Sequence, residues 1–196
     1  MHRKVAADVR RSRRNFTTLE IGAGTLNHLG YEPLSKSYDI VEPFEELYKG
    51  APNRARVANV YPDLDQIAGR HFDRIISIAT FEHLCNLPSV VARSGLLLAH
   101  GGALRVAIPS EGTLLWTLGW KLTTGVEFRL RHGLSYGVLM RYEHVNTAAE
   151  IANVLGIFFK DIRRQVFGIS HLLSFYQFFE CFKPDIERCQ SYFLTR

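Results

Sequence analysis

The chain has 196 residues, of which 46% are hydrophobic, which is enough to build the core of one domain spanning residues 1–196. Its three cysteines include no close-spaced pair, so the composition argues against a disulfide framework or a zinc site and favours a reducing, cytoplasmic location. No apolar run approaches the roughly 20 residues that a transmembrane helix needs.

The net charge of +5 is carried entirely by residues 1–14, which we expect to form a basic helix with Val5 and Val9 on its inner side. The rest of the chain is balanced, so the basic composition gives only weak support for a nucleic-acid partner. We therefore interpret this helix as a solvated face. Contact with RNA, or peripheral contact with a membrane surface, is the alternative.

A strand is predicted at residues 17–21, and the turn Gly22-Ala23-Gly24 follows it directly. Glycines allow the backbone to turn sharply and to approach a ligand closely. A second predicted strand, residues 38–42, ends in Glu42, eighteen residues after Gly24, where a carboxylate can accept hydrogen bonds from a ribose diol. Together these features predict a nucleotide-type pocket.

Two phosphate-binding patterns do not fit this turn. A dinucleotide fingerprint requires a third glycine, where this chain has Asn27, and a P-loop requires a lysine, although none occurs between Lys4 and Lys36. Residues 25–34 are expected to form a short helix, with His28 on its surface.

Strand and helix patterns continue to alternate, which predicts an α/β fold with a doubly wound, mostly parallel sheet. Further strands are expected at residues 56–60, 72–78, 101–109, 158–167 and 172–182, with a helix at 88–98 and another opened by the capping-box pattern of Thr147 and Glu150. Residues 110–142 interrupt the alternation with many aromatic residues and glycines. We expect them to form either a lid over the substrate site or an apolar packing helix.

Several of these segments, in the same order, resemble class I S-adenosylmethionine-dependent methyltransferases. The segments are Glu20-Ile21-Gly22-Ala23-Gly24, Glu42, Phe72-Asp73-Arg74-Ile75 with Glu82-His83-Leu84 after it, and Gly101-Gly102 leading to Pro109. The resemblance implies S-adenosyl-L-methionine as the cofactor. It also implies a Rossmann-like, seven-stranded sheet whose antiparallel C-terminal strand lies between the fifth and sixth strands.

The same resemblance implies a set of cofactor-binding residues. They are Glu20, Gly22, Ala23, Gly24, Glu42, Pro43, Tyr61, Asp63, Ala79 and Thr80. Glu20 and the glycines are expected to face the methionine end, and Tyr61 and Asp63 the adenine. A plain turn at Pro62 explains Asp63 nearly as well.

Transfer of a methyl group to a hydroxyl requires a general base, and a histidine suits this role near neutral pH. His144 and His83, in that order, are the candidate catalytic residues. Each follows a glutamate, and each could instead only brace its own turn. No metal is expected, because Glu82 and His83 supply too few ligands. Cys85 is expected to be a small, buried apolar residue rather than a nucleophile.

The predicted function is therefore methylation of a hydroxyl on a small-molecule or sugar-like glycan acceptor, as in the small bacterial methyltransferases of glycan and secondary-metabolite pathways that the chain resembles. Two alternatives stay open at this point. One is an RNA methyltransferase that uses the basic N-terminal helix, and the other is a catalytically inactive partner protein that binds the cofactor. The sequence leaves open whether the chain is a monomer or a homodimer.

Overall fold

The fold comes from a computed structural model, which describes residues 1–12, 16–33, 36–110, 131, 144–170 and 173–194. The predicted lid at residues 110–142 therefore lies outside the described residues, except for its first residue and Arg131. Arg13 and Arg14 of the predicted basic helix also lie outside them.

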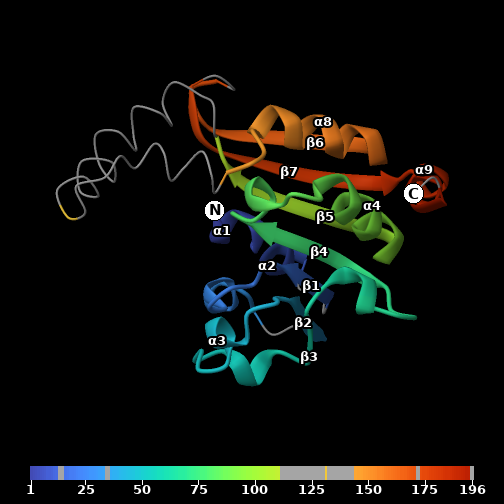
Figure 1. Ribbon diagram of the computed structural model, residues 1–196. Helices are drawn as coiled ribbons and strands as arrows, with labels where there is room; N and C mark the ends of the chain where they lie inside the picture. The colour runs from blue at the N-terminus through green and yellow to red at the C-terminus, as the bar shows by residue number, and fades with distance from the viewer. Residues whose placement is uncertain (13–15, 34–35, 111–130, 132–143, 171–172, 195–196) are drawn as a thin grey trace.

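A seven-stranded sheet forms the centre of the molecule, with the strand order β3-β2-β1-β4-β5-β7-β6 (Figure 1). The strands are β1 (Thr17–Ile21), β2 (Ser37–Val41), β3 (Asn59–Tyr61), β4 (Phe72–Ile78), β5 (Leu98–Pro109), β6 (Phe159–Gly168) and β7 (Ser174–Pro184). The first five run parallel, whereas β7 is antiparallel to both β5 and β6. The predicted α/β fold, with a late strand placed between the fifth and sixth, is confirmed.

The helices and short 3-10 turns precede, connect and follow these strands. They are α1 (His2–Val5), α2 (Ala7–Ser12), η1 (Asn27–Gly30), α3 (Glu45–Tyr48), η2 (Arg54–Arg56), η3 (Leu64–Gln66), η4 (Phe81–His83), α4 (Leu87–Leu97), α8 (Ala148–Phe158) and α9 (Ile186–Leu194). Among the described residues, no helix has both the length and the apolar character that crossing a membrane requires.

Three of these elements differ from the predictions. The helix expected at residues 25–34 is only the turn η1, and the third strand begins later than expected because Arg54–Arg56 form a 3-10 turn. Helix α9 was not predicted. It places Cys189 in the core, whereas its other residues are largely polar or partly exposed, so the sequence pattern is weak there.

The alternation of side chains along the strands builds a core on each face of the sheet. Leu19, Ile75 and Val106 belong to the core on one face, together with the apolar sides of α4, α8 and α9. Ile40 and Ile76 belong to the core on the other face, where Val5 of α1 packs against them. The sheet is thus covered by helices on both faces, as its parallel strands require.

The N-terminal helices are fixed to the sheet by buried ion pairs. Arg74 on β4 is 1% exposed, and its Nε lies 2.8 Å from Oδ2 of Asp8 while its Nη2 lies 2.8 Å from Oε1 of Glu32. Nε of Arg105 lies 3.2 Å from the same Asp8 oxygen, and its Nη1 pairs with Glu180 on β7. Val5 and Val9 are buried as predicted, so α1 and α2 are an integral part of the fold.

Two side chains predicted from the sequence lie in the opposite environment. His28 is buried rather than on the surface, because its Nε2 lies 2.6 Å from Glu32 Oε1 inside this ion-pair cluster. Cys85 is exposed rather than buried, because it lies in the loop between η4 and α4 and its side chain does not face the core.

Candidate functional site

The glycine turn after β1 has a backbone that only glycine adopts without strain. Gly22 has φ of +71° and Gly24 has φ of +49°. The backbone N–H of Gly22 donates to Val41 O at 2.9 Å, which joins the turn to the end of β2. A Cβ atom on Gly22 would overlap the side chain of Thr80, so there is also no room for a larger residue.

Glu42 joins the glycine turn to the end of the second strand. Its Oε2 accepts a hydrogen bond from the N–H of Gly24 at 2.8 Å, and its Oε1 accepts one from the N–H of Phe44 at 3.1 Å. A carboxylate has about four acceptor positions, so each oxygen can accept a further hydrogen bond. The structure therefore fixes the orientation of Glu42 and leaves acceptor capacity for a diol.

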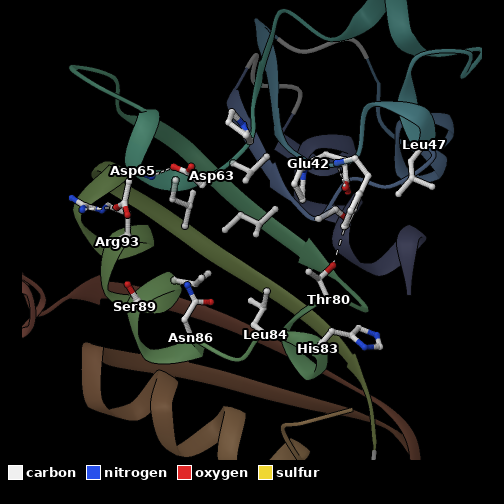
Figure 2. A pocket seen from close by; sticks show the side chains of 18 of the residues that line it. Glu42, Leu47, Asp63, Asp65, Thr80, His83, Leu84, Asn86, Ser89 and Arg93 are labelled. Carbon is white, nitrogen blue, oxygen red and sulfur yellow. Dashed lines mark hydrogen bonds and ion pairs between the residues drawn. The ribbon is translucent and has the colours of Figure 1, made fainter. Parts of the chain in front are cut away.

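A cavity of about 460 Å³ lies beside this turn, at the carboxyl ends of β1, β2 and β4 (Figure 2). This volume is within the usual range for small-molecule sites, about 300 to 1,000 Å³. In parallel α/β sheets, ligands bind at this end of the strands. The cavity brings together seven of the predicted site residues: Gly22, Glu42, Pro43, Asp63, Ala79, Thr80 and His83.

One end of the cavity is formed by η3 and α4. Asp63 Oδ1 accepts from the N–H of Asp65 at 2.8 Å and from that of Gln66 at 3.0 Å, so this carboxylate caps η3. Nη2 of Arg93 lies 2.6 Å from Asp65 Oδ1, and its guanidinium lies 4.4 Å from the ring centroid of Phe193 on α9. Figure 2 shows Asp63, Asp65 and Arg93 together at this end.

The other end of the cavity is formed by residues 79–84. Ala79 has φ of +53°, which is costly for a residue with a Cβ, and its N–H donates to Ala107 O at 2.8 Å on β5. The hydroxyl of Thr80 donates to Ile78 O at 3.2 Å. His83 follows in η4, and its side chain is 41% exposed. The hydrogen bond to β5 holds the strained backbone at Ala79, which directs the chain into the turn that carries His83.

The two candidate bases meet at this end of the cavity. The rings of His83 and His144 have centroids 4.5 Å apart and planes at 79°, an edge-to-face contact between residues far apart in the sequence. His83 lines the cavity, whereas His144 contacts the His83 ring and is not among the lining residues. Nε2 of His83 also lies 4.0 Å from Oε1 of the buried Glu82.

Five predicted site residues do not line the cavity: Glu20, Ala23, Gly24, Tyr61 and His144. Glu20 was expected to face the cofactor, but its side chain lies on the opposite face of β1 from Ile21, which does line the cavity. There it accepts a hydrogen bond from the Tyr38 hydroxyl at 2.7 Å, and burial raises its pKa to about 8. Ala23 and Tyr61 pack against the core, and Gly24 acts through its N–H on Glu42.

Other residues of the cavity were missed by the sequence analysis. They are chiefly Leu47, Leu64, Leu84, Asn86, Ser89 and Arg93. The spacing of Asn86, Ser89 and Arg93 along the start of α4 would have placed them on one helix face, but nothing in the sequence indicates which face meets the cavity. Among the described residues, no group of three or more His, Cys, Asp or Glu side chains is arranged to hold a metal ion.

The strand order is that of the class I S-adenosylmethionine-dependent methyltransferase fold. No protein-family model and no curated protein is similar enough to this sequence to count as a match. Solved structures agree on the fold. An S-adenosylmethionine-dependent methyltransferase from Thermotoga maritima has a TM-score of 0.62 at 15% identity, over 92% of this chain and 88% of that one.

Two further solved structures contain S-adenosylhomocysteine. Magnesium protoporphyrin IX methyltransferase from Synechocystis PCC 6803 has a TM-score of 0.60 at 14% identity, over 93% of this chain and 81% of that one. An N-methyltransferase from Bradyrhizobium japonicum WM9 has a TM-score of 0.60 at 16% identity, over 92% of this chain and 85% of that one. The chain therefore has the methyltransferase fold that the sequence predicted.

Proposed function

We propose that this chain is an S-adenosylmethionine-dependent methyltransferase that methylates a hydroxyl of a small-molecule or sugar-like acceptor. The observation that carries the proposal is the cavity at the carboxyl ends of β1, β2 and β4, where the Gly22 turn and the fixed carboxylate of Glu42 lie side by side. The solved methyltransferases with bound S-adenosylhomocysteine share this fold and support the choice of cofactor.

The residues present fit the chemistry of this cofactor. Glu42 keeps acceptor positions for a ribose diol, and Leu47 and Leu64 offer apolar surface for a flat purine. Among the described residues that line the cavity, Arg93 is the one lysine or arginine, and it is paired with Asp65. The described walls thus suit a nucleoside without phosphates better than a nucleotide.

The bound cofactor would supply an activated methyl group on a sulfonium sulfur. The chain has to align the acceptor oxygen with that methyl carbon and to exclude water. During methyl transfer to the acceptor oxygen, His83 would take the hydroxyl proton on an imidazole nitrogen. His144 contacts the His83 ring and orients it, or accepts the proton itself.

Cofactor binding is the first test of this proposal. Titration calorimetry with S-adenosylmethionine should show binding to the wild-type chain and a loss of at least about tenfold in affinity for Glu42→Ala, because the carboxylate both fixes the turn and meets the diol. Gly156→Ala is the matched control, since Gly156 lies in α8 with open space around it. A wild-type chain that does not bind the cofactor would refute the proposal.

Turnover is the second test, because a cofactor-binding partner protein would also pass the first. Cell extract is incubated with methyl-labelled cofactor and the wild-type chain, and label is expected in a small-molecule or glycan fraction. Label that appears only in RNA would favour the nucleic-acid alternative. No transfer to any fraction, with intact cofactor binding, would favour the inactive partner protein.

A further inference from the structure

The turn that carries His83 is held by a segment more than 60 residues away in the sequence. The side-chain amide of Asn146 donates to Phe81 O at 2.9 Å and to Leu84 O at 2.7 Å. The backbone N–H groups of Val145 and Asn146 both donate to Glu82 O, at 2.9 and 3.1 Å. Three backbone carbonyls of the turn thus receive four hydrogen bonds from two adjacent residues.

This arrangement uses the full donor capacity of the Asn146 amide, which has two N–H groups. The carbonyls that it binds lie on either side of His83, at Phe81 and Leu84. The position of the His83 backbone is therefore fixed from both sides. Leu84 and His83 line the cavity, so the same bonds also place one wall of it.

The segment that holds the turn also carries His144, two residues before Asn146. The edge-to-face contact between the His83 and His144 rings depends on the relative position of the two backbones. The four hydrogen bonds set that relative position, since they join the backbones of the two segments directly or through the Asn146 amide.

From these contacts we infer that Asn146 is a positioning residue, which holds His83 against His144 at the edge of the cavity. Asn146 is not among the residues that line the cavity, so we expect it to act through the turn. The inference deepens the proposed function and rests on it for the role of the two histidines. The geometric part, that Asn146 sets the histidine pair, can be tested separately.

A neighbouring residue provides a matched structural control. Thr147 caps α8, because its hydroxyl accepts from the N–H of Glu150 at 3.3 Å and the Glu150 carboxylate accepts from the N–H of Thr147 at 2.7 Å. Loss of such a cap costs about 1 kcal/mol of stability. The hydrogen bonds of the Thr147 side chain go to Glu150 and not to the turn, so Thr147→Ala should lower stability without releasing His83.

The experiment compares Asn146→Asp, Asn146→Ala and Thr147→Ala by NMR of chains labelled with ¹³C in the histidine rings. Asn146→Asp has the same shape but lacks the two side-chain N–H donors, and Asn146→Ala avoids a new charge beside the carbonyls. The wild type and Thr147→Ala should show a ring-to-ring cross-peak between His83 and His144, assigned with His83→Gln. Both Asn146 variants should lose it.

The functional readout has two parts. The first is the affinity for S-adenosylmethionine, and the second is the rate at which labelled methyl groups are transferred to the extract fraction that accepts them. For the Asn146 variants we expect cofactor affinity to change less than about threefold and the transfer rate to fall at least about tenfold. An intact cross-peak in both Asn146 variants would overturn the inference, as would an equal fall in rate for Thr147→Ala. A wild-type chain without cofactor binding would refute the proposed function, and the cross-peak would still decide the positioning role.

Discussion

Glu20 and Glu42 are both buried carboxyl groups near the glycine turn, and their hydrogen bonds give them different roles. Glu42 accepts two backbone N–H groups, which fix its orientation beside the glycine turn. Glu20 accepts a hydrogen bond from the Tyr38 hydroxyl, and burial raises its pKa to about 8. Glu20 is therefore largely protonated at neutral pH, and its hydrogen bond with Tyr38 links β1 to β2.

This protonation predicts a pH dependence of stability. Because the pKa of Glu20 is raised from 4.5 to about 8 by folding, the folded state holds a proton that the unfolded state releases between these values. Stability is lost as the pH rises from 4.5 to 8, by at most about 1.4 kcal/mol per pH unit. Glu20→Gln stays neutral, so it should become progressively more stable than the wild type over this range. Urea unfolding from pH 5 to 8 measures the difference, and two parallel curves would contradict it.

Gly22 gives a second prediction at this scale. Gly22→Ala should lower the free energy of unfolding by at least about 2 kcal/mol, because it adds both a strained φ and an overlap with Thr80. Adding Thr80→Gly to Gly22→Ala should recover the part of the lost unfolding free energy that is due to the overlap. The part that is due to the strained φ should remain. Denaturant unfolding of the two single variants and the double variant separates these effects, and purely additive losses would contradict the overlap.

At the scale of elements, the Asp8 carboxylate helps to hold α1 and α2 on the sheet. Asp8 lies between Arg74 and Arg105, whose side chains are 1% and 5% exposed. If the carboxylate is lost, both cations stay buried and water cannot solvate them in its place. The cost of an unpaired buried charge is larger than the value of the pair itself. Glu32 and Glu180 hold the same arginines from other elements, so the cluster links the helices to β4, β5 and β7.

Asp8→Asn should therefore lower the free energy of unfolding by about 3 kcal/mol, as measured by urea titration near pH 7. The matched control is Glu45→Gln, which removes the exposed ion pair with Lys49 at 3.4 Å and should change stability by less than about 0.5 kcal/mol. Equal changes in the free energy of unfolding for the two substitutions would show that the buried cluster stabilises the fold no more than an exposed ion pair does.

At the scale of the whole molecule, the fold could be predicted from the sequence because its signals are local and sequential. Each of these signals involves residues that are only a few positions apart, as in the glycine turn, the apolar strands and the capping box of Thr147. The order of the signals along the chain specifies the sheet. The environment of Glu20 could not be predicted, because it depends on Tyr38 in the neighbouring strand. That of His28 could not be predicted either, because its local partner Glu32 is buried by pairing with Arg74, 42 residues away. The cavity residues of α4 were missed for the same reason.

The basic N-terminus gives a prediction for the whole chain. Removal of residues 1–12 should prevent stable folding, because it leaves Arg74 and Arg105 buried without Asp8 and exposes the core covered by Val5. The double variant Arg3→Gln and Arg11→Gln removes two exposed charges and should fold like the wild type.

If this segment binds RNA, the double variant should reduce the slope of log affinity against log salt by about 2. An unchanged slope would exclude these arginines as phosphate contacts.

The position of β7 between β5 and β6 has a consequence for synthesis of the chain. β5 pairs with β7, but α8 and β6 come earlier in the sequence than β7. On the ribosome, the growing chain therefore presents the open edge of β5, with Val106, Ala107 and Ile108 in it, until the last strand emerges. Such an unpaired apolar edge is the kind of surface that aggregates or recruits chaperones during slow, non-local folding.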